Sequence, residues 1–281
     1  MMTGSREGLA ERIREAGRCL RRCQLCEHRC GVDRTAGQRG DCGANSRARC
    51  LKRGMSFAEE VDLLPSYMVY FGGCNLRCRF CIQGPDCFAV DRGEPVTAAR
   101  FAGIFRQAVR DGARTINLVG GEPSLHVPTI LRIARACDGP LPLVLNTNMY
   151  MTAVVLELLD GVVELYLADL KFGNDRCARR LCGAGRYFRT VTRNLLQAAR
   201  RTRLLVRHLL LPGHVDCCFL PAARWMAEYL PNANFHVMDS YVPGPGSVAD
   251  PSLGRLVSRQ EADQAARWMD KLGLRNHEGF A

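Results

Sequence analysis

Short apolar runs alternate with longer helical patterns from residue 67 onward, and this alternation limits the folds that the chain can form. The expected strands are 67–73, 115–121, 141–148, 162–171, 204–213 and 234–242, and the expected helices between and after them are 97–111, 127–137, 151–160, 189–201, 219–230 and 258–272. Six β–α units in sequence predict an α/β fold, a parallel sheet with helices outside it. Because a closed barrel of such units has eight strands, we expect an open, partial (β/α)6 barrel.

The segments that indicate chemistry stand at the ends of these strands. GGCNLRC follows the first strand and GGEP the second, NTN lies on the third, DLK ends the fourth, and PGH follows the fifth. In folds of this class, ligands bind at the carboxyl ends of the strands. We therefore expect the functional site at that edge of the sheet.

The chain holds 15 cysteines in 281 residues, and most of them lie before residue 90. The N-terminus is charged and lacks an apolar signal core, and no apolar run is long enough to span a membrane, so we expect a cytoplasmic protein. Thiols stay reduced in that compartment. Clustered cysteines therefore indicate metal or iron–sulfur sites rather than disulfides.

The formal net charge is +11, which raises the question of an RNA or acidic partner. Single-stranded nucleic-acid binding favours basic runs interleaved with aromatic residues. No such run occurs in this sequence. A solvated, arginine-rich surface is the simpler interpretation.

Three cysteines, Cys74, Cys78 and Cys81, follow the first strand with the spacing C-x3-C-x2-C. A structural [4Fe–4S] cluster takes four cysteine ligands, one for each iron. Three thiolates on one tight loop would leave one iron open to another ligand, as catalytic metal sites do. The alternative is a zinc loop that takes a fourth ligand from elsewhere, such as Cys87.

This cysteine motif, with an aromatic residue before its last cysteine and GGEP after the next strand, resembles the radical S-adenosylmethionine (SAM) superfamily. The segments CQLCEHRCGVDRTAGQRGDCGA, INLVGGEPSLHVPTIL, LYLADLKFG and VRHLLLPGH resemble uncharacterised homologues of pyruvate formate-lyase activating enzyme with an extra N-terminal cysteine segment. The resemblance implies reductive cleavage of SAM to a 5′-deoxyadenosyl radical that abstracts hydrogen. It also implies a low-potential electron donor such as flavodoxin or ferredoxin, and a glycyl radical enzyme as protein substrate.

The resemblance carries a SAM site over to the ends of the strands. Gly120, Gly121 and Glu122 would lie against the methionyl amino group, and Phe80 beside the adenine. Other implied contacts come from the next three strands: Asn146, Asp169, Lys171 and Arg207. Asn146 departs from the family pattern, which has an acidic residue there. A family histidine near the last strand is not reproduced, and we expect His208, His214 and His236 to be satisfied by ordinary contacts.

A second metal site is expected near the N-terminus, after a helix at 6–22. Cys23, Cys26, Cys30 and Cys42 follow C-x2-C-x3-C-x11-C, and four thiolates suit either zinc or an auxiliary iron–sulfur cluster. The remaining cysteines beyond this segment have no ligand-like spacing, and we expect them to be single thiols: Cys87, Cys137, Cys177, Cys182, Cys217 and Cys218. A redox pair at Cys217–Cys218 is a minor alternative.

The expected domains are the N-terminal helix and cysteine segment (1–65), a radical SAM core (66–245) and a C-terminal helical extension (246–281). The functional hypothesis is a radical SAM enzyme of the glycyl-radical-activase type. The alternatives are a radical SAM enzyme acting on RNA or a small molecule, and a non-catalytic zinc-binding protein.

Overall fold

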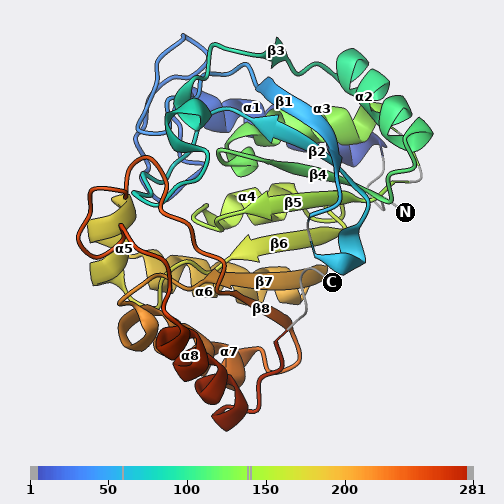
Figure 1. Ribbon diagram of the computed structural model, residues 1–281. Coiled ribbons are helices and arrows are strands. Elements are labelled where there is room, and N and C mark those ends of the chain that lie inside the picture. The colour runs from blue at the N-terminus through green and yellow to red at the C-terminus, as the bar shows by residue number, and fades with distance from the viewer. Residues whose placement is uncertain (1–5, 59, 138, 140, 277–281) are drawn as a thin grey trace.

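The computed structural model describes residues 6–58, 60–137, 139 and 141–276, so the outermost ends of the expected first and last domains lie outside the described residues. Its centre is one eight-stranded sheet with the order β3-β1-β2-β4-β5-β6-β7-β8 (Figure 1). The strands are β1 Arg49–Ser56, β2 Ser66–Phe71, β3 Glu94–Pro95, β4 Thr115–Gly120, β5 Leu143–Thr147, β6 Leu165–Asp169, β7 Arg203–Leu209 and β8 Asn234–Met238.

The six strands β2, β4, β5, β6, β7 and β8 are parallel, which confirms the α/β fold and the parallel sheet. Each of them falls within a residue of, or inside, a run expected from the sequence. Two further strands were not predicted. β1 pairs antiparallel with β2, and the short β3 pairs with β1, so the end of the cysteine-rich segment belongs to the same sheet.

Helices precede and follow the strands as expected, with boundaries that shift by at most two residues. They are α1 Arg6–Arg21, α2 Ala98–Arg110, α3 Val127–Ala136, α4 Ala153–Leu158, α6 Tyr187–Ala199, α7 Leu220–Tyr229 and α8 Arg259–Lys271. An additional helix, α5 (Asp175–Cys182), and a π-helical turn at Val215–Phe219 were not predicted. α5 begins at Asn174, whose side chain accepts from the Cys177 amide, and ends at Gly183 in the left-handed conformation.

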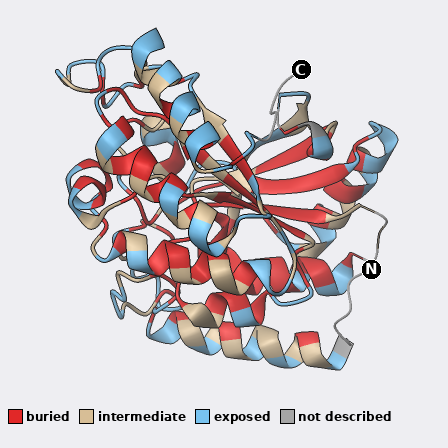
Figure 2. Cartoon of the chain, turned by 90° about the horizontal axis from the view of Figure 1, so that it is seen from below, coloured by how far each residue is buried: buried red, intermediate tan, exposed pale blue. Residues whose placement is uncertain are grey.

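The alternation of side chains along the strands divides the core into two faces. On the face that packs on the helices, apolar side chains such as Ile116, Leu145 and Val206 join the main core. On the other, concave face, Val144, Leu165, Leu167 and Leu205 form a separate apolar layer, and Leu63 closes it. Figure 2 shows the buried strands fanning out over the row of helices.

The sheet is open, because β3 and β8 stand at its two ends and do not pair with each other. This is the partial barrel that the number of β–α units predicts. Each edge of the sheet has a distinctive local feature. β3 has only two residues, and at β8 the Asn276 side chain accepts from the Val237 amide (2.7 Å) and donates to its carbonyl (3.4 Å).

The carboxyl ends of the parallel strands meet at the left of Figure 1, where α5 and the segment that leads into α8 also lie. There the loop after β2 rests directly on the turn after β4. The Gly121 amide donates to the Phe71 carbonyl (2.8 Å), and the Glu122 amide donates to the Gly73 carbonyl (2.7 Å). A Cβ on Gly121 would lie 2.0 Å from the Gly73 oxygen, so only glycine permits this approach.

Gly121→Ala should therefore destabilise the fold by at least about 2 kcal/mol, since neither backbone segment has room to move. The free energy of unfolding, measured by anaerobic urea titration, checks this. Gly103→Ala in α2 is the matched control, because nothing lies within 4 Å of a Cβ built there. That change should be neutral or stabilising by about 0.5–1 kcal/mol. Equal stabilities for the two variants would contradict the packing described here.

Candidate functional site

The loop that carries Cys74, Cys78 and Cys81, here called the cysteine loop (residues 72–82), is held on several sides by backbone contacts. The Cys74 amide donates to the Cys42 carbonyl (3.2 Å), which ties it to the N-terminal cysteine segment. The Arg77 and Arg79 amides donate to the carbonyls of Cys182 and Leu181 at the end of α5 (both 2.9 Å). The loop is therefore clamped between two parts of the chain that are distant in sequence.

All three predicted thiols are half-buried and lie near the Lys171 ammonium, which favours the thiolate form of each. Burial raises the pKa of Cys74 to about 12. A hydrogen bond from the Cys87 thiol lowers the pKa of Cys81 to about 6. Three converging thiols beside a cation suit an anionic iron–sulfur cluster, because soft thiolates are its ligands and the cation offsets its charge.

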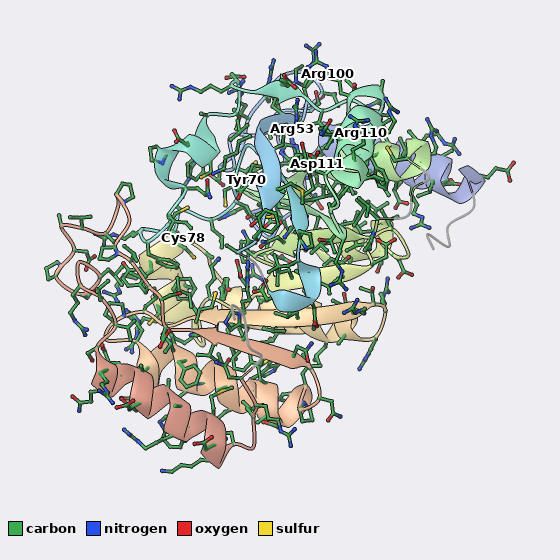
Figure 3. The ribbon with its side chains drawn as sticks, turned by 45° about the vertical axis from the view of Figure 1, so that its right-hand side comes forward. Arg53, Tyr70, Cys78, Arg100, Arg110 and Asp111 are labelled. Carbon is green, nitrogen blue, oxygen red and sulfur yellow. The ribbon has the colours of Figure 1, made fainter. Side chains whose placement is uncertain are left out.

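Two further cysteines, expected as single thiols, stand beside this group. Cys182 forms a hydrogen bond with Cys78, and this bond together with burial raises the pKa of Cys78. Cys87 stands beside Cys81. Figure 3 shows Cys78 next to the pale yellow ribbon of α5, which carries Cys182. The sequence could not have revealed Cys182, because α5 comes from a different βα loop, whereas Cys87 follows Cys81 closely and was named as the fourth ligand of the zinc alternative.

The side chain of Glu122, at the turn after β4, is buried among the loops that border the site. Its carboxylate accepts from the Ser124 amide (3.1 Å), the Thr147 hydroxyl (2.7 Å) and the Asn148 amide (2.8 Å). Burial raises its pKa in spite of these donors. The side chain thus joins the loops after β4 and β5, while the contact of this turn with SAM stays a prediction.

The four polar residues predicted on the later strands form one connected network on the concave face. The Asp169 carboxylate accepts from Lys171 Nζ (2.8 Å) and from Arg207 Nε (2.9 Å). A second nitrogen of Arg207 donates to Asn146 Oδ1 (2.7 Å). The structure therefore brings Asn146, Asp169, Lys171 and Arg207 together at the carboxyl edge, as their positions at the strand ends predict.

Sequence reasoning missed two members of this network. The buried Glu60 carboxylate lies 3.5 Å from Arg207 Nη1 and 3.3 Å from His236 Nδ1. Glu60 belongs to the connection between β1 and β2, which had no recognisable pattern. His236 was expected to have ordinary contacts, and Glu60 provides one. His208 likewise is satisfied, because its Nδ1 contacts the Leu170 carbonyl at 2.6 Å.

Opposing effects set the charges of Asp169 and Lys171, the pair at the centre of the network. Burial alone would favour neutral Asp169, but Arg207 and Lys171 outweigh it and hold the pKa of Asp169 below its ordinary value. Burial also opposes the charge of Lys171, yet Asp169 keeps its pKa above the ordinary value. Both groups are therefore ionised at neutral pH. Phe80 is buried nearby, edge-to-face with Phe172 at 5.8 Å between ring centroids.

The four N-terminal cysteines lie near one another, although no three of their sulfurs form a group within 4.8 Å in the described part of the chain. Cys23, Cys26 and Cys42 are buried and Cys30 is exposed, and all 15 cysteines are free. Burial raises the pKa of Cys26 to about 12, and the neighbouring Cys42, Cys23 and Cys30 add to this rise. His28 of this segment contacts the Asn75 carbonyl of the cysteine loop (2.7 Å). The N-terminal segment therefore packs directly on the site.

Comparison with known proteins identifies the family. The sequence profile of the radical SAM superfamily matches residues 68–226, and the chain belongs to this superfamily. An uncharacterized protein of Methanocaldococcus jannaschii is 33% identical over 270 residues, 94% of this chain and 78% of that protein. GTP 3′,8-cyclase of Acidothermus cellulolyticus is 37% identical over 81 residues, which are 27% of this chain and only 22% of the cyclase.

A solved structure confirms the fold. Streptococcus suis SuiB bound to its precursor peptide SuiA matches with a TM-score of 0.54 at 14% identity, over 73% of this chain and 45% of SuiB. The chain thus spans less than half of SuiB. Within the described part of the chain, every helix is too short or too polar to cross a membrane.

Asp169→Asn should lower the free energy of unfolding by about 3 kcal/mol, because it leaves the mostly buried Lys171 without its anion and Arg207 with Glu60 alone. Glu94→Gln, which removes an exposed partner of Arg53, is the control and should change stability little. Anaerobic urea titration measures both. A loss for Asp169→Asn no larger than for the control would contradict the network.

The stabilisation of the fold by the Asp169 carboxylate has a defined pH dependence. Because the pKa of Asp169 is lowered by folding, its carboxylate stabilises the protein above the unfolded value of about 3.9. This stabilisation is lost as pH falls through the lower, folded pKa. The difference between the parent and Asp169→Asn should therefore be full at neutral pH and shrink in acid.

Proposed function

We propose that this protein is a radical SAM enzyme that cleaves SAM reductively and takes a hydrogen atom from a peptide substrate, as glycyl-radical-activating enzymes do. The observation that supports SAM cleavage is the convergence of three half-buried thiols beside Lys171 at the carboxyl edge of an open parallel sheet. The superfamily match covers this region.

Cys74, Cys78 and Cys81 would hold the [4Fe–4S] cluster, which when bound would supply the electron for reductive cleavage of SAM to methionine and a 5′-deoxyadenosyl radical. The other residues bind and orient. The methionyl end of SAM carries one ammonium and one carboxylate, and the Asp169–Lys171 pair offers the complementary charges 2.8 Å apart. Gly120 and Gly121 line a cleft, and the backbone of Phe71 and Gly73 occupies the places where their side chains would lie.

A cleft lies beside these glycines. It is lined by residues of β1, β2, the end of β4 and the segment after the cysteine loop, among them Leu51, Lys52, Tyr70, Gln83, Gly120 and Gly121. Lys52 Nζ lies 4.2 Å from the centroid of the Tyr70 ring, and Figure 3 shows Tyr70 on β2, which leads to the loop of Cys78. The concave face offers polar groups as well, since the buried Asn117 amide has no hydrogen-bond partner among the described residues.

The proposal of a peptide substrate rests on the open sheet. A partial barrel has a lateral gap, and a gap admits a loop of another protein, whereas a closed barrel admits only a small molecule. Glycine is the natural target, because its Cα is unhindered and its radical is stabilised between two amides. The cyclase relatives make a small molecule the second candidate, and they resemble only 27% of this chain.

The N-terminal cysteines would hold a second metal centre. Cys23, Cys26, Cys30 and Cys42 provide four thiols in one segment, and this segment contacts the cysteine loop through Cys42 and His28. An ion or cluster there would supply folding free energy to a segment with little apolar core of its own.

The first experiment measures iron content and SAM cleavage in cysteine variants. Alanine at Cys74, Cys78 or Cys81 should remove about four irons per chain and abolish formation of 5′-deoxyadenosine under anaerobic reducing conditions. Cys87→Ser is the control, and it should keep the cluster and at least part of the activity. A parent rate in any of the three alanine variants would refute the assignment, and loss of the cluster in Cys87→Ser would favour four protein ligands.

The second experiment tests the substrate. A partner protein labelled with deuterium at glycine Cα should deliver the label into 5′-deoxyadenosine, because the radical takes its hydrogen from that position. The control is the same partner labelled at alanine Cα, which should deliver none. Label that arrives only from a small metabolite or from RNA ribose would refute the activase proposal and leave SAM cleavage intact.

A further inference from the structure

Four side chains outside the site described above gather at the carboxyl ends of β6 and β7. Cys177 comes from α5, His214 from the loop after β7, and Cys217 and Cys218 from the π-helical turn that follows. Three of the four are buried and Cys217 is half-buried. The sequence predicted single thiols here, because the first cysteine and the other three residues lie far apart in the chain.

The separations between their ligand atoms fit one metal ion. Cys217 Sγ lies 3.8 Å from Cys177 Sγ and 3.9 Å from Cys218 Sγ. His214 Nδ1 lies 3.2 Å from Cys217 Sγ and 3.5 Å from Cys218 Sγ, and all four atoms lie within 4.8 Å of one another. A tetrahedral zinc ion with metal–sulfur bonds of about 2.3 Å and metal–nitrogen bonds of about 2.0 Å requires edges of roughly 3.8 and 3.5 Å.

We propose that Cys177, His214, Cys217 and Cys218 bind one structural zinc ion through three thiolates and one imidazole. The donor set is soft and complete, as in closed structural zinc sites, so no position is left for a substrate. Nearby backbone is arranged tightly around the sulfurs. A Cβ on Gly173 would lie 2.2 Å from the Cys218 carbonyl, and Asn174 Nδ2 lies 3.7 Å from Cys218 Sγ.

The His214 imidazole has one contact that competes with zinc binding. Arg180 Nη2 lies 3.1 Å from His214 Nε2, so in this arrangement Nε2 accepts a hydrogen bond from the guanidinium. With zinc on Nδ1, Nε2 itself carries the proton and donates it outward. Arg180 is exposed and free to turn into solvent. Arg180→Gln should therefore bind zinc as tightly as the parent, or more tightly.

The ion would have a structural consequence for the cysteine loop through α5. One end of this helix carries Cys177, and the other end carries Cys182, which lies against Cys78. The carbonyls of Leu181 and Cys182 also accept the Arg79 and Arg77 amides of the loop. Zinc would fix α5 to the π-helical turn, and α5 in turn would hold the loop of the predicted cluster.

The test is metal analysis of the full chain, purified anaerobically, by mass spectrometry of the elements and zinc X-ray absorption. The parent should contain about one zinc ion per chain in a site of three sulfurs and one nitrogen. Cys177→Ser, Cys217→Ser and His214→Gln should each lose that ion. Cys137→Ser, a buried thiol outside the group, is the matched control and should keep it.

Parallel measurements separate this site from the N-terminal cysteines and from misfolding. In Cys26→Ser the zinc with the sulfur–nitrogen signature should remain. His214→Gln should keep the parent circular dichroism and the iron of the cluster, with faster release of that iron to a chelator. Unchanged zinc in the Cys177, Cys217 and His214 variants would overturn the proposal, as would a disulfide within the group in the anaerobically purified parent. These outcomes do not depend on whether the protein cleaves SAM.

Discussion

The close approach of two backbone segments, the cysteine loop and the Gly120–Gly121 turn, is the constraint on which the site depends. Neighbouring parallel strands bring the two segments to the same edge, but a side chain on Gly121 would keep them apart. Two short hydrogen bonds then fix the loop relative to β4. Because the loop is anchored there, its three half-buried thiols are held near Lys171.

The second organising feature is a chain of charges in an otherwise apolar interior. Desolvation disfavours each of these charges, and only their mutual pairing keeps them ionised. Asp169 is the centre, since it accepts from Lys171 and Arg207, and Arg207 extends the network to Glu60. A buried network of this kind contributes less to stability than to position, because every member is held by at least one other at a defined distance.

The regular part of the fold could be predicted from the sequence, and the irregular part could not. Buried parallel strands such as β5 and β7 have near-continuous apolar runs, so they were found together with their helices. β1, by contrast, is an arginine- and glycine-containing strand whose pairing partner alone makes it a strand. α5 is short, yet Asn174 and Gly183 at its ends were signals that could have revealed it.

The residues of the site divide in the same way, into those that the sequence could place and those that it could not. Residues on strand ends, such as Asp169 and Arg207, could be placed together because a parallel sheet aligns those ends. The neighbours that come from loops could not, because their positions depend on loop paths that no periodicity describes. Cys182 beside Cys78, Glu60 beside Arg207, and the group around His214 are all of this kind.

The two edges of the sheet limit how another polypeptide can engage this protein. A peptide often binds by adding a strand to an exposed edge, where unpaired backbone groups accept it. Here β3 has only two residues, and at β8 the Asn276 side-chain amide already forms hydrogen bonds with the backbone amide and carbonyl of Val237, as a neighbouring strand would. At the β8 edge a polypeptide would therefore be held by side chains rather than by an extended backbone ladder, whereas residues 51–56 of β1 lie beyond the two residues that pair with β3 and have no second strand beside them among the described residues. Selectivity would then depend on hydrogen-bonding register at the β1 edge and on the shape of the partner at the β8 edge.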